Sequence, residues 1–528
     1  MTRDRDLMND MPSTELPAMR LSAADHVRTQ HRAADHRADR GAPDTGAAGT
    51  VAADPVTRDA GALDVPVQPN VLAQPNIVAN NIAADHIVPV PRPRSGLGRP
   101  TPVLSALSVP GIATVAVVGM GYVGLPTALA LHRQGIGVIG LDVSQTRLSA
   151  IRSRQVDLLP TDLGRLAAAL EDPGFRVTDD ADELAEADAV IICVPTPVDA
   201  HLNPDLQALA GACAAVVARA RPGQVLVLTS TTYVGCTRDL LVTPLAERGL
   251  RAGEDVFVAF SPERIDPGIA EHEHTTTPRV LGGVTPECAQ WASDVVGLLT
   301  ESVHLVSSAE AAELTKLYEN TFRAVTLALA NEFAGICRSL DLDPVEVTRA
   351  AATKPYGFLA TYPGPGVGGH CIPCDPHYLL WQLRSSRTPA PLIEQAMTAI
   401  AERPHQVVAR AVEVMSDLGR GLGGARVLVV GVAYKPGVQD VRETPAVEII
   451  PGLEARGASV WYVDPLVPSM SLPDGRLMAS HASAADEDWD LVLLHTVHPQ
   501  HDYSWVSRST TVLDATYRFE SLPSRHVV

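Results

Sequence analysis

The sequence predicts an α/β protein in which two Rossmann-like, doubly wound domains are joined by a central helical domain and preceded by a disordered N-terminal tail. Three observations lead to this prediction. Short apolar runs alternate with helical stretches from about residue 110, as buried parallel strands do in doubly wound folds. A second series of such runs begins at residue 426, after a long helical region at 308–340. About the first 100 residues lack this periodicity.

The predicted tail covers residues 1–108 and is rich in Ala, Asp, Arg, Pro and His. The tetrapeptide Ala-Ala-Asp-His occurs at 23–26, 33–36 and 83–86, a spacing too irregular for a solenoid. This composition, with almost no aromatic residues, favours disorder. Two alternatives stay open, namely weak metal binding by the histidines and a translation start further along the chain.

The predicted domains follow the tail in order. A first Rossmann domain is expected at 109–306, with strands at Thr114–Val118, Val138–Leu141, Ala189–Val194, Val225–Leu228 and Val256–Phe260. A helical domain is expected at 307–415, with a capping box of Ser307 and Glu310 and a Gly/Pro-rich loop at 361–376. A second Rossmann-like domain is expected at 416–528, with strands at Arg426–Val430, Val460–Val463, Leu491–Leu494 and Thr511–Leu513.

Composition restricts the partners. The net charge of -19 disfavours nucleic acid, although a local group of donors can still bind a phosphorylated small molecule. The seven cysteines are dispersed and odd in number, which disfavours a secreted disulfide framework. No apolar run reaches about 18 residues, and no apolar signal segment opens the chain. We therefore expect a cytoplasmic protein without a membrane span.

A glycine-rich turn follows the first predicted strand, and it reads Gly119-Met120-Gly121-Tyr122-Val123-Gly124. Such a turn lets the chain bend sharply and approach a pyrophosphate at a helix N-terminus. Asp142 ends the next strand, 18 residues after Gly124, where a carboxylate can hold ribose hydroxyls and disfavour a 2′-phosphate. The sequence thus predicts NAD as cofactor. The residues predicted to bind it are Gly119, Gly121, Tyr122, Val123, Gly124, Asp142, Arg147, Thr196 and Thr231.

Cys371 lies in the most glycine-dense stretch of the chain, which makes it a candidate nucleophile. A buried structural cysteine is the alternative. Cys371 and Cys374 also spell C-x-x-C near His370 and His377, so a redox pair or half of a zinc site is a further alternative. No second C-x-x-C exists, and we predict no bound metal.

Lys316 and Asn320 share one face of the long predicted helix, because they are four residues apart. They could form a solvated polar pair. A lysine held near a reacting centre could instead stabilise an oxyanion and favour the thiolate of Cys371.

With these motifs, the chain from about 112 to 518 resembles the UDP-glucose/GDP-mannose dehydrogenase family. The resemblance implies an N-terminal NAD-binding domain, a central helical domain that forms a homodimer, and a C-terminal domain that binds the nucleotide sugar. It also implies catalytic roles for Cys371 as nucleophile, Lys316 and Asn320 as oxyanion and water ligands, Asp375 in proton transfer, Glu263 as base for thioester hydrolysis, and Thr231 as support for the water.

The substrate site is implied in the same way. Lys435 and Arg442, in the segments Gly431–Pro436 and Asp440–Pro445, would meet the diphosphate-sugar, for which cationic donors are suited. The full set of substrate-binding residues that the resemblance implies is Glu263, Arg264, Lys316, Asn320, Lys354, Gly368, Lys435 and Arg442. Ser261–Gly268 and Thr353–Phe358 most resemble the bacterial UDP-N-acetylglucosamine or UDP-N-acetylgalactosamine branch. Cys374 departs from the family pattern.

The implied reaction is a four-electron oxidation of the C6 hydroxyl of a UDP-sugar to a carboxylate, with a thiohemiacetal and a thioester on Cys371. UDP-glucose is the alternative substrate. A single-step β-hydroxyacid dehydrogenase would need neither Cys371 nor the second α/β domain, and would yield one NADH instead of two. A catalytically silent nucleotide-sugar-binding protein is the third alternative.

Overall fold

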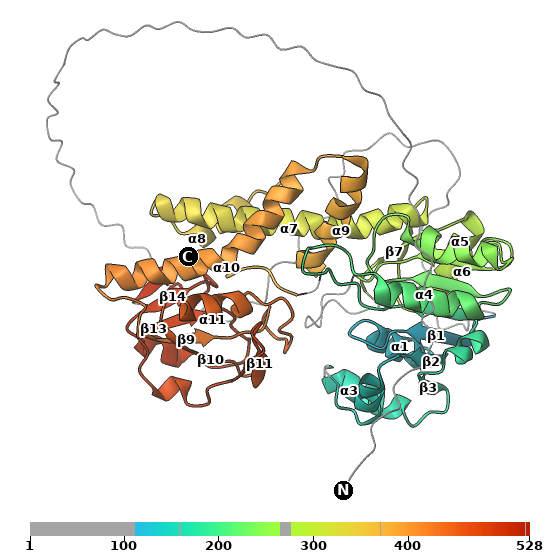
Figure 1. Ribbon diagram of the computed structural model, residues 1–528, viewed down its shortest axis with the longest axis horizontal. Coiled ribbons are helices and arrows are strands. Elements are labelled where there is room, and N and C mark those ends of the chain that lie inside the picture. Colours follow the sequence, from blue (N-terminus) through green and yellow to red (C-terminus); the bar gives the residue numbers. More distant parts are fainter. Residues whose placement is uncertain (1–110, 157, 159, 265–275, 370, 523) are drawn as a thin grey trace, which may run out of the picture. The chain divides into compact units, whose positions relative to one another are not determined.

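A computed structural model describes residues 111–156, 158, 160–264, 276–369, 371–522 and 524–528. It contains two separate layered α/β units connected by long helices (Figure 1). The predicted tail at 1–108 lies outside the described residues, as do Ile265–Gly268 and His370. Among the described residues, no helix is both long enough and apolar enough to cross a membrane. The predicted fold class is confirmed.

The N-terminal sheet has eight strands in the order β3-β2-β1-β4-β5-β6-β7-β8. The first six run parallel, whereas β7 is antiparallel to β6 and β8 is parallel to β7. The sequence predicted five of these strands and missed β3, β7 and β8. The strands are β1 (Thr114–Val118), β2 (Gly137–Leu141), β3 (Phe175–Thr178), β4 (Ala189–Ile192), β5 (Val225–Leu228), β6 (Phe257–Phe260), β7 (Arg279–Gly283) and β8 (Val303–Leu305).

Helices cover both faces of this sheet. Alternate residues of β1 face opposite sides, so Val117 joins one apolar cluster with Leu125, and Ala116 joins the other with Leu209. All four side chains are fully buried. The helices are α1 (Gly124–Arg133), α2 (Gln145–Arg152), α3 (Pro160–Ala169), α4 (Gln207–Arg219), α5 (Thr243–Glu247) and α6 (Pro286–Gly297).

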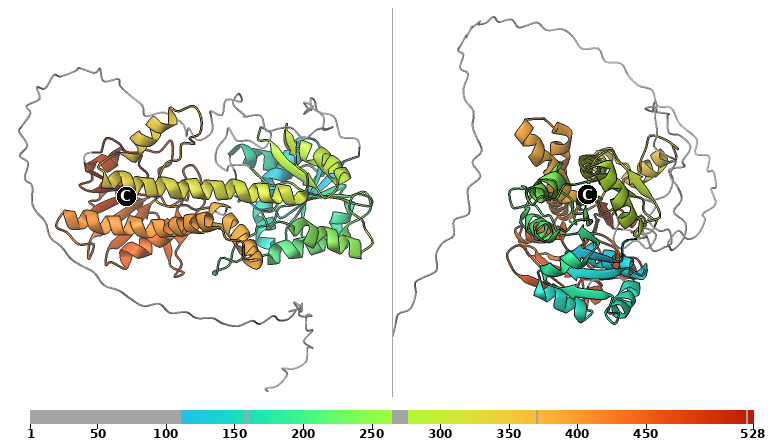
Figure 2. Two further views of the ribbon diagram at one scale, coloured as in Figure 1. Left: turned by 90° about the horizontal axis from the view of Figure 1, so that it is seen from above. Right: turned by 90° about the vertical axis from the view of Figure 1, so that its right-hand side faces the viewer.

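The central part is helical and includes α7 (Ala309–Ser339), α8 (Pro344–Ala352), α9 (Cys371–Ser386) and α10 (Pro391–Asp417). Figure 2 shows α7 and α10 side by side, and α9 also packs against α7. The cap of α7 is Ser308, whose hydroxyl accepts a hydrogen bond from the amide of Ala311 at 3.2 Å. The predicted capping residue, Ser307, is wrong by one position.

The predicted loop at 361–376 is wrong in its second half, because α9 begins at Cys371. Pro373 stands in the first turn, where a helix does not need the missing N–H group, and Pro376 removes one further donor. Two prolines close to a helix start therefore looked like loop residues. As a result, Cys371 lies at a helix N-terminus, where backbone N–H groups and the helix dipole favour negative charge.

The C-terminal sheet has five parallel strands in the order β10-β9-β13-β14-β15, with a separate hairpin of β11 and β12. Helix α11 (Ala446–Glu454) packs against α10. Both sheets reverse strand order, the first between β1 and β4 and the second between β9 and β13, and such points bind ligands in open α/β sheets. The strands are β9 (Arg426–Val430), β10 (Ser459–Val463), β11 (Ser469–Ser471), β12 (Leu477–Ala479), β13 (Leu491–Leu494), β14 (Val512–Asp514) and β15 (Arg525–Val527).

Candidate active site

The glycine turn after β1 has one open glycine and two tightly packed ones. A Cβ atom on Gly119 would lie 2.9 Å from the carbonyl oxygen of Cys193, and one on Gly124 would lie 1.8 Å from that of Gly119. These two glycines are required by packing. A Cβ atom on Gly121 would meet nothing within 4 Å. The backbone at Gly121, just before the N-terminus of α1, therefore has room for a pyrophosphate, as the NAD prediction requires.

Asp142 and Arg147 support the same turn. The carboxylate of Asp142 accepts hydrogen bonds from the amides of Met120 and Ser144, both at 2.8 Å. The Nε atom of Arg147 donates to the carbonyl of Met120 at 2.7 Å. Asp142 is half-buried at the end of β2, so its oxygens can also reach a ligand on the turn. These contacts fit a dinucleotide held at this edge of the sheet.

The other predicted cofactor residues are distributed around the same edge. Thr196 is buried in the loop after β4, and Thr231 is half-buried in the loop after β5. Tyr122 is 49% exposed, and the guanidinium of Arg442 lies 4.1 Å from the centre of its ring. This cation–π contact brings the glycine turn next to Lys435 and Arg442, the residues predicted to hold the diphosphate-sugar, which we call the clamp.

Cys371 is exposed at the first position of α9. Desolvation by the surrounding protein is the largest cause that raises the pKa of its thiol, and the negative charge of Asp375 adds to it. Lys316, Arg442 and Arg323 act in the opposite direction but do not outweigh these two causes. The expectation that Lys316 favours the thiolate is right in sign.

Asp375 follows Cys371 by one turn of α9 and is 1% exposed. Burial raises the pKa of Asp375 to about 6, although Lys316 and a hydrogen bond from Asn320 lower it. The Nδ2 atom of Asn320 donates to Oδ2 of Asp375. Within the described part of the chain, the buried Oδ1 atom has no hydrogen-bond partner. A buried carboxylate with one free oxygen can take a proton from a ligand or a water molecule.

Lys316 and Asn320 are both buried on α7, one turn apart, as their spacing predicted. The Nζ atom of Lys316 donates to the backbone carbonyl of Glu263 at 2.7 Å. The carboxylate of Glu263 accepts hydrogen bonds from Nη2 of Arg279 at 2.6 Å and from the amide of Arg264 at 2.8 Å. Glu263 is therefore adjacent to Lys316, and its carboxylate is paired with Arg279, a partner that the sequence did not indicate.

The guanidinium of Arg264 is already paired with other groups of the protein. Its Nη2 atom pairs with Oε1 of Glu319 at 2.7 Å, and its Nη1 atom donates to the carbonyl of Pro278 at 2.7 Å. Lys354 is exposed after α8, with its ammonium 5.0 Å from the ring centre of Tyr356. Within the described residues, Lys354 has no hydrogen bond or ion pair with another predicted site residue. The structure therefore does not bring Lys354 into the group.

The glycines before Cys371 press the loop against the C-terminal domain. A Cβ atom on Gly368 would lie 2.6 Å from the carbonyl oxygen of Glu443, and one on Gly369 would lie 2.9 Å from the ring of Tyr434. The amide of Gly369 donates to the carbonyl of Arg442 at 2.9 Å. Close packing of the loop on the predicted clamp therefore requires these two glycines.

The clamp residues lie in the loop after β9. Arg442 is paired with the carboxylate of Asp440, whose Oδ2 atom is 2.6 Å from Nη2. The ammonium of Lys435 lies 5.9 Å from the ring centre of Tyr434. Arg442 also contributes positive charge at Cys371, together with Arg323 of α7. Sequence reasoning missed Arg323, although it follows Lys316 by seven residues and so occupies the same side of the helix.

Three family models match the chain in sequence order. They describe the NAD binding domain, the central domain and the UDP binding domain of the UDP-glucose/GDP-mannose dehydrogenase family, and they match residues 113–298, 310–400 and 428–519. These matches fall on both α/β units and include most of α7, with α8 and α9, between them.

Individual relatives are similar over most of their length. A UDP-N-acetyl-D-glucosamine 6-dehydrogenase from Pseudomonas aeruginosa is 35% identical over 67% of this chain and 83% of its own. An NDP-N-acetyl-D-galactosaminuronic acid dehydrogenase from Ralstonia nicotianae is 33% identical over 73% of this chain and 91% of its own. The structure of a UDP-D-ManNAc dehydrogenase from Pyrococcus horikoshii superposes with a TM-score of 0.71 at 30% identity, over 78% of this chain and 98% of that one.

Proposed function

The chain belongs to the UDP-glucose/GDP-mannose dehydrogenase family, and on that premise we propose that it oxidises the C6 hydroxyl of a UDP-N-acetylhexosamine to a carboxylate through Cys371. It is an NAD-dependent nucleotide-sugar dehydrogenase. The observation that carries the proposal is the grouping of an exposed Cys371 with the buried Asp375, Asn320 and Lys316, next to the clamp residue Arg442.

The cofactor and the substrate have separate parts of the site. The turn at Gly119–Gly124, the N-terminus of α1 and Asp142 would hold NAD, which accepts hydride from the sugar carbon. Lys435 and Arg442 would hold the diphosphate through charge-assisted hydrogen bonds. The overall reaction consumes one sugar alcohol, two NAD and one water, and it yields one carboxylate, two NADH and three protons.

The protein side chains then act on the carbon and its protons. Asp375 would accept the proton of the C6 hydroxyl as the C6 carbon loses hydride, which leaves an aldehyde. The thiol of Cys371 would add to this aldehyde, and its proton would pass to the aldehyde oxygen. Loss of a second hydride and of the hydroxyl proton would convert this thiohemiacetal to a thioester, with NAD as the oxidant in both steps. Lys316 and Asn320 donate hydrogen bonds to the carbonyl oxygen as negative charge develops there. Water that is positioned by Thr231 and Glu263 breaks the C–S bond, which releases the acid and restores the thiol.

The choice of sugar rests on the relatives, because two of the three named above carry an N-acetylhexosamine in their names and the third carries an N-acetylhexosaminuronic acid. A panel of UDP- and GDP-sugars, scored by the NADH formed per sugar, tests both the sugar and the reaction. We expect two NADH per UDP-N-acetylhexosamine and much slower turnover of UDP-glucose. One NADH per sugar would instead support the single-step dehydrogenase, and preference for UDP-glucose would overturn the choice of sugar.

The raised pKa of Asp375 gives a prediction for the pH dependence. Only the ionised carboxylate accepts a proton, so turnover should fall as the pH decreases below about 6. Asp375→Asn should remove this acidic limb and reduce kcat by about 10²-fold. The check is a pH–rate profile for both proteins. An unchanged acidic limb in the variant would exclude Asp375 as the titrating group.

The same pKa predicts an effect on stability. Because the folded pKa of about 6 exceeds the ordinary 3.8, the folded state binds the extra proton between these values, and it loses stability as pH rises through that range. Asp375→Asn carries no charge to bury, so it should be more stable than the wild type at pH 8. Thermal unfolding at pH 4 and pH 8 measures this difference, which should be small at pH 4.

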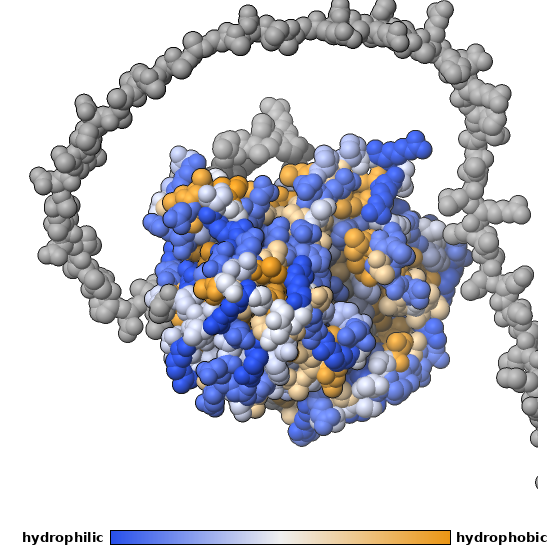
Figure 3. Space-filling view, turned by 60° about the vertical axis from the view of Figure 1, so that its left-hand side comes forward, coloured by the Kyte–Doolittle hydropathy of each residue, from blue (hydrophilic) through white to orange (hydrophobic). Residues whose placement is uncertain are grey.

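We propose that α7 forms a homodimer interface. Figure 3 shows hydrophobic patches separated by hydrophilic side chains on one face of the molecule. Large apolar side chains along α7 are 37–67% exposed at intervals of three, four or seven residues, which is unusual for a helix that faces water. They are Leu314, Tyr318, Phe322, Leu329, Phe333 and Ile336, followed by Leu340 immediately after the helix.

Light scattering after gel filtration tests this interface. The wild type should show about twice the chain mass of 55.9 kDa. Leu329→Asp combined with Phe333→Asp should shift it toward the monomer, because the charges would be buried without partners. Leu477→Asp, at a 68% exposed position of β12, is the matched control and should leave the mass unchanged. If the double variant remained a dimer, the interface would have to lie elsewhere than on α7.

A further inference from the structure

A buried carboxylate on α7 holds the segment 231–237, which follows β5 and includes Thr231. Glu313 is fully buried. Its Oε2 atom accepts a hydrogen bond from the amide of Gly235 at 2.6 Å, and its Oε1 atom accepts from the amide and the hydroxyl of Thr237 at 2.8 and 2.6 Å. Three donors therefore meet one carboxylate at the start of the helical turn that follows.

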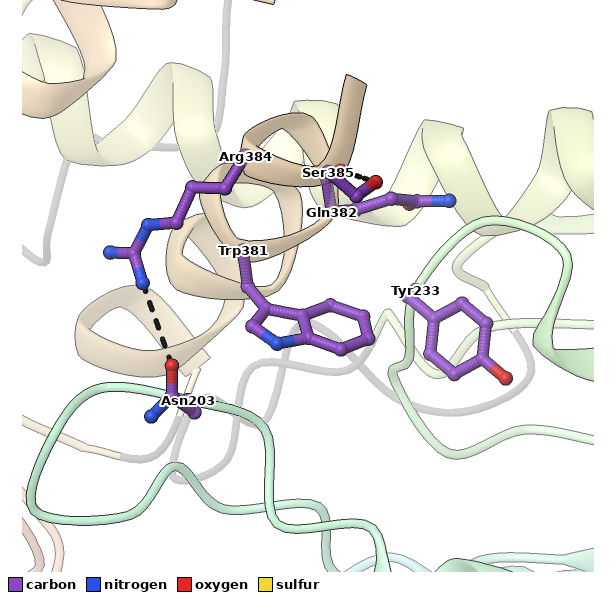
Figure 4. A pocket seen from close by; sticks show the side chains of 6 residues that line it. All are labelled: Asn203, Tyr233, Trp381, Gln382, Arg384 and Ser385. Carbon is purple, nitrogen blue, oxygen red and sulfur yellow. Dashed lines mark hydrogen bonds between the residues drawn. The ribbon is translucent and has the colours of Figure 1, made fainter. Parts of the chain in front are cut away.

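A side-chain amide on α9 holds the same segment from another side. The Nε2 atom of Gln382 donates to the carbonyl of Val234 at 2.7 Å, and its Oε1 atom accepts from the amide of Val234 at 3.0 Å. Gln382 thus makes the same pair of hydrogen bonds to the backbone of Val234 that a neighbouring β-strand would make. In Figure 4, Gln382 and Trp381 of α9 face the loop that carries Tyr233, at a cavity of about 610 Å³. The rings of Tyr233 and Trp381 are 5.7 Å apart.

The two contacts come from the helices that carry the proposed chemistry. Glu313 precedes Lys316 by three residues on α7, and Gln382 follows Asp375 by seven residues on α9. Each pair occupies one side of its helix. We propose that Glu313 and Gln382 are positioning residues that fix Thr231 relative to Cys371. This inference rests on the proposed function, since Thr231 is assigned there to the water that hydrolyses the thioester.

The free-energy cost of burying a carboxylate indicates that the contact at Glu313 is specific. Burial is the largest cause that raises the pKa of Glu313, and the hydrogen bonds from Thr237 and Gly235 lower it. A buried carboxylate is costly unless its oxygens are satisfied. The N-terminus of the following helix, which begins near Thr237, offers N–H groups and positive potential to this charge. The loop backbone and the carboxylate therefore hold each other in one arrangement.

The test uses Glu313→Gln and Gln382→Met in the full chain. In Glu313→Gln, the new side-chain NH2 group would face the backbone N–H donors of Gly235 or Thr237, so a hydrogen bond is lost there. Gln382→Met keeps the length of the side chain but loses both hydrogen bonds to Val234. Displacing Thr231 should lower kcat by about 10²-fold, while KM for the UDP-sugar changes less than about 2-fold. Thioester should accumulate on Cys371 and be visible by mass spectrometry after acid quench. Glu310→Gln is the matched control, because Glu310 pairs with Arg238 at the surface of the same helix.

Hydrogen exchange separates failure of this inference from failure of the proposed function. The amides of Gly235 and Thr237 should exchange faster in Glu313→Gln, and that of Val234 faster in Gln382→Met, without any substrate present. Faster exchange with unchanged turnover, or with no accumulated thioester, would overturn the positioning role. Protection equal to the wild type would overturn it as well. A wild-type protein that oxidises no nucleotide sugar would instead contradict the proposed function.

Discussion

Cys371→Ser is expected to lower formation of the sugar acid by about 10⁴-fold or more, on the scale of other enzymes that lose a nucleophile. A serine hydroxyl is far less nucleophilic than sulfur and can form no thioester. Desolvation by the surrounding protein and the negative charge of Asp375 already raise the pKa of the Cys371 thiol, so this position does not favour an anion. Asp375 and Lys316 remain in place, so the variant should still bind substrate.

Rapid quench with mass spectrometry measures this result. The wild type should show a covalent sugar adduct on the peptide that contains Cys371, and the variant should show none. Cys374→Ala is the matched control, since Cys374 is 4% exposed and burial raises the pKa of its thiol to about 12. Turnover to the acid by Cys371→Ser would remove the nucleophile assignment. Loss of activity in Cys374→Ala alone would favour a C-x-x-C redox pair instead.

Lys316→Met is expected to reduce kcat by about 10²- to 10³-fold, as when an enzyme loses one donor to a developing oxyanion. The ammonium of Lys316 is buried, and it lowers the pKa of both Cys371 and Asp375. Without it, the pKa of Asp375 should rise above about 6, so the acidic limb of the pH profile should move to higher pH. The carbonyl of Glu263 would also lose its donor.

The pH–rate profile of Lys316→Met tests both parts of this prediction. Arg338→Met is a suitable control, because Arg338 also lies on α7 but pairs with Glu413 at the surface. It should keep the wild-type profile. A Lys316→Met enzyme with lower kcat and an unmoved acidic limb would mean that Lys316 acts on the oxyanion without tuning Asp375. Unchanged kcat would exclude Lys316 from the reaction.

Burial explains which strands could be predicted. The bounds of β1, β5, β9 and β13 agree with the apolar runs, because nearly all of their residues are buried and no polar position interrupts them. The missed strands β3 and β8 are short and partly exposed, so they lack a continuous run. The direction of β7 depends on its pairing with β6, which no local pattern reports.

Local spacing and the family resemblance were enough to predict the fold class, the NAD-binding turn and the candidate residues Cys371, Lys316, Asn320 and Asp375. The folded chain adds that Cys371 starts a helix, that Arg279 pairs with Glu263, and that Glu313 and Gln382 hold the segment with Thr231. Most of these contacts join segments that are far apart along the chain. Gln382 and Val234 are 148 residues apart, and burial, charge and hydrogen bonding between such segments exist only after the helices have packed.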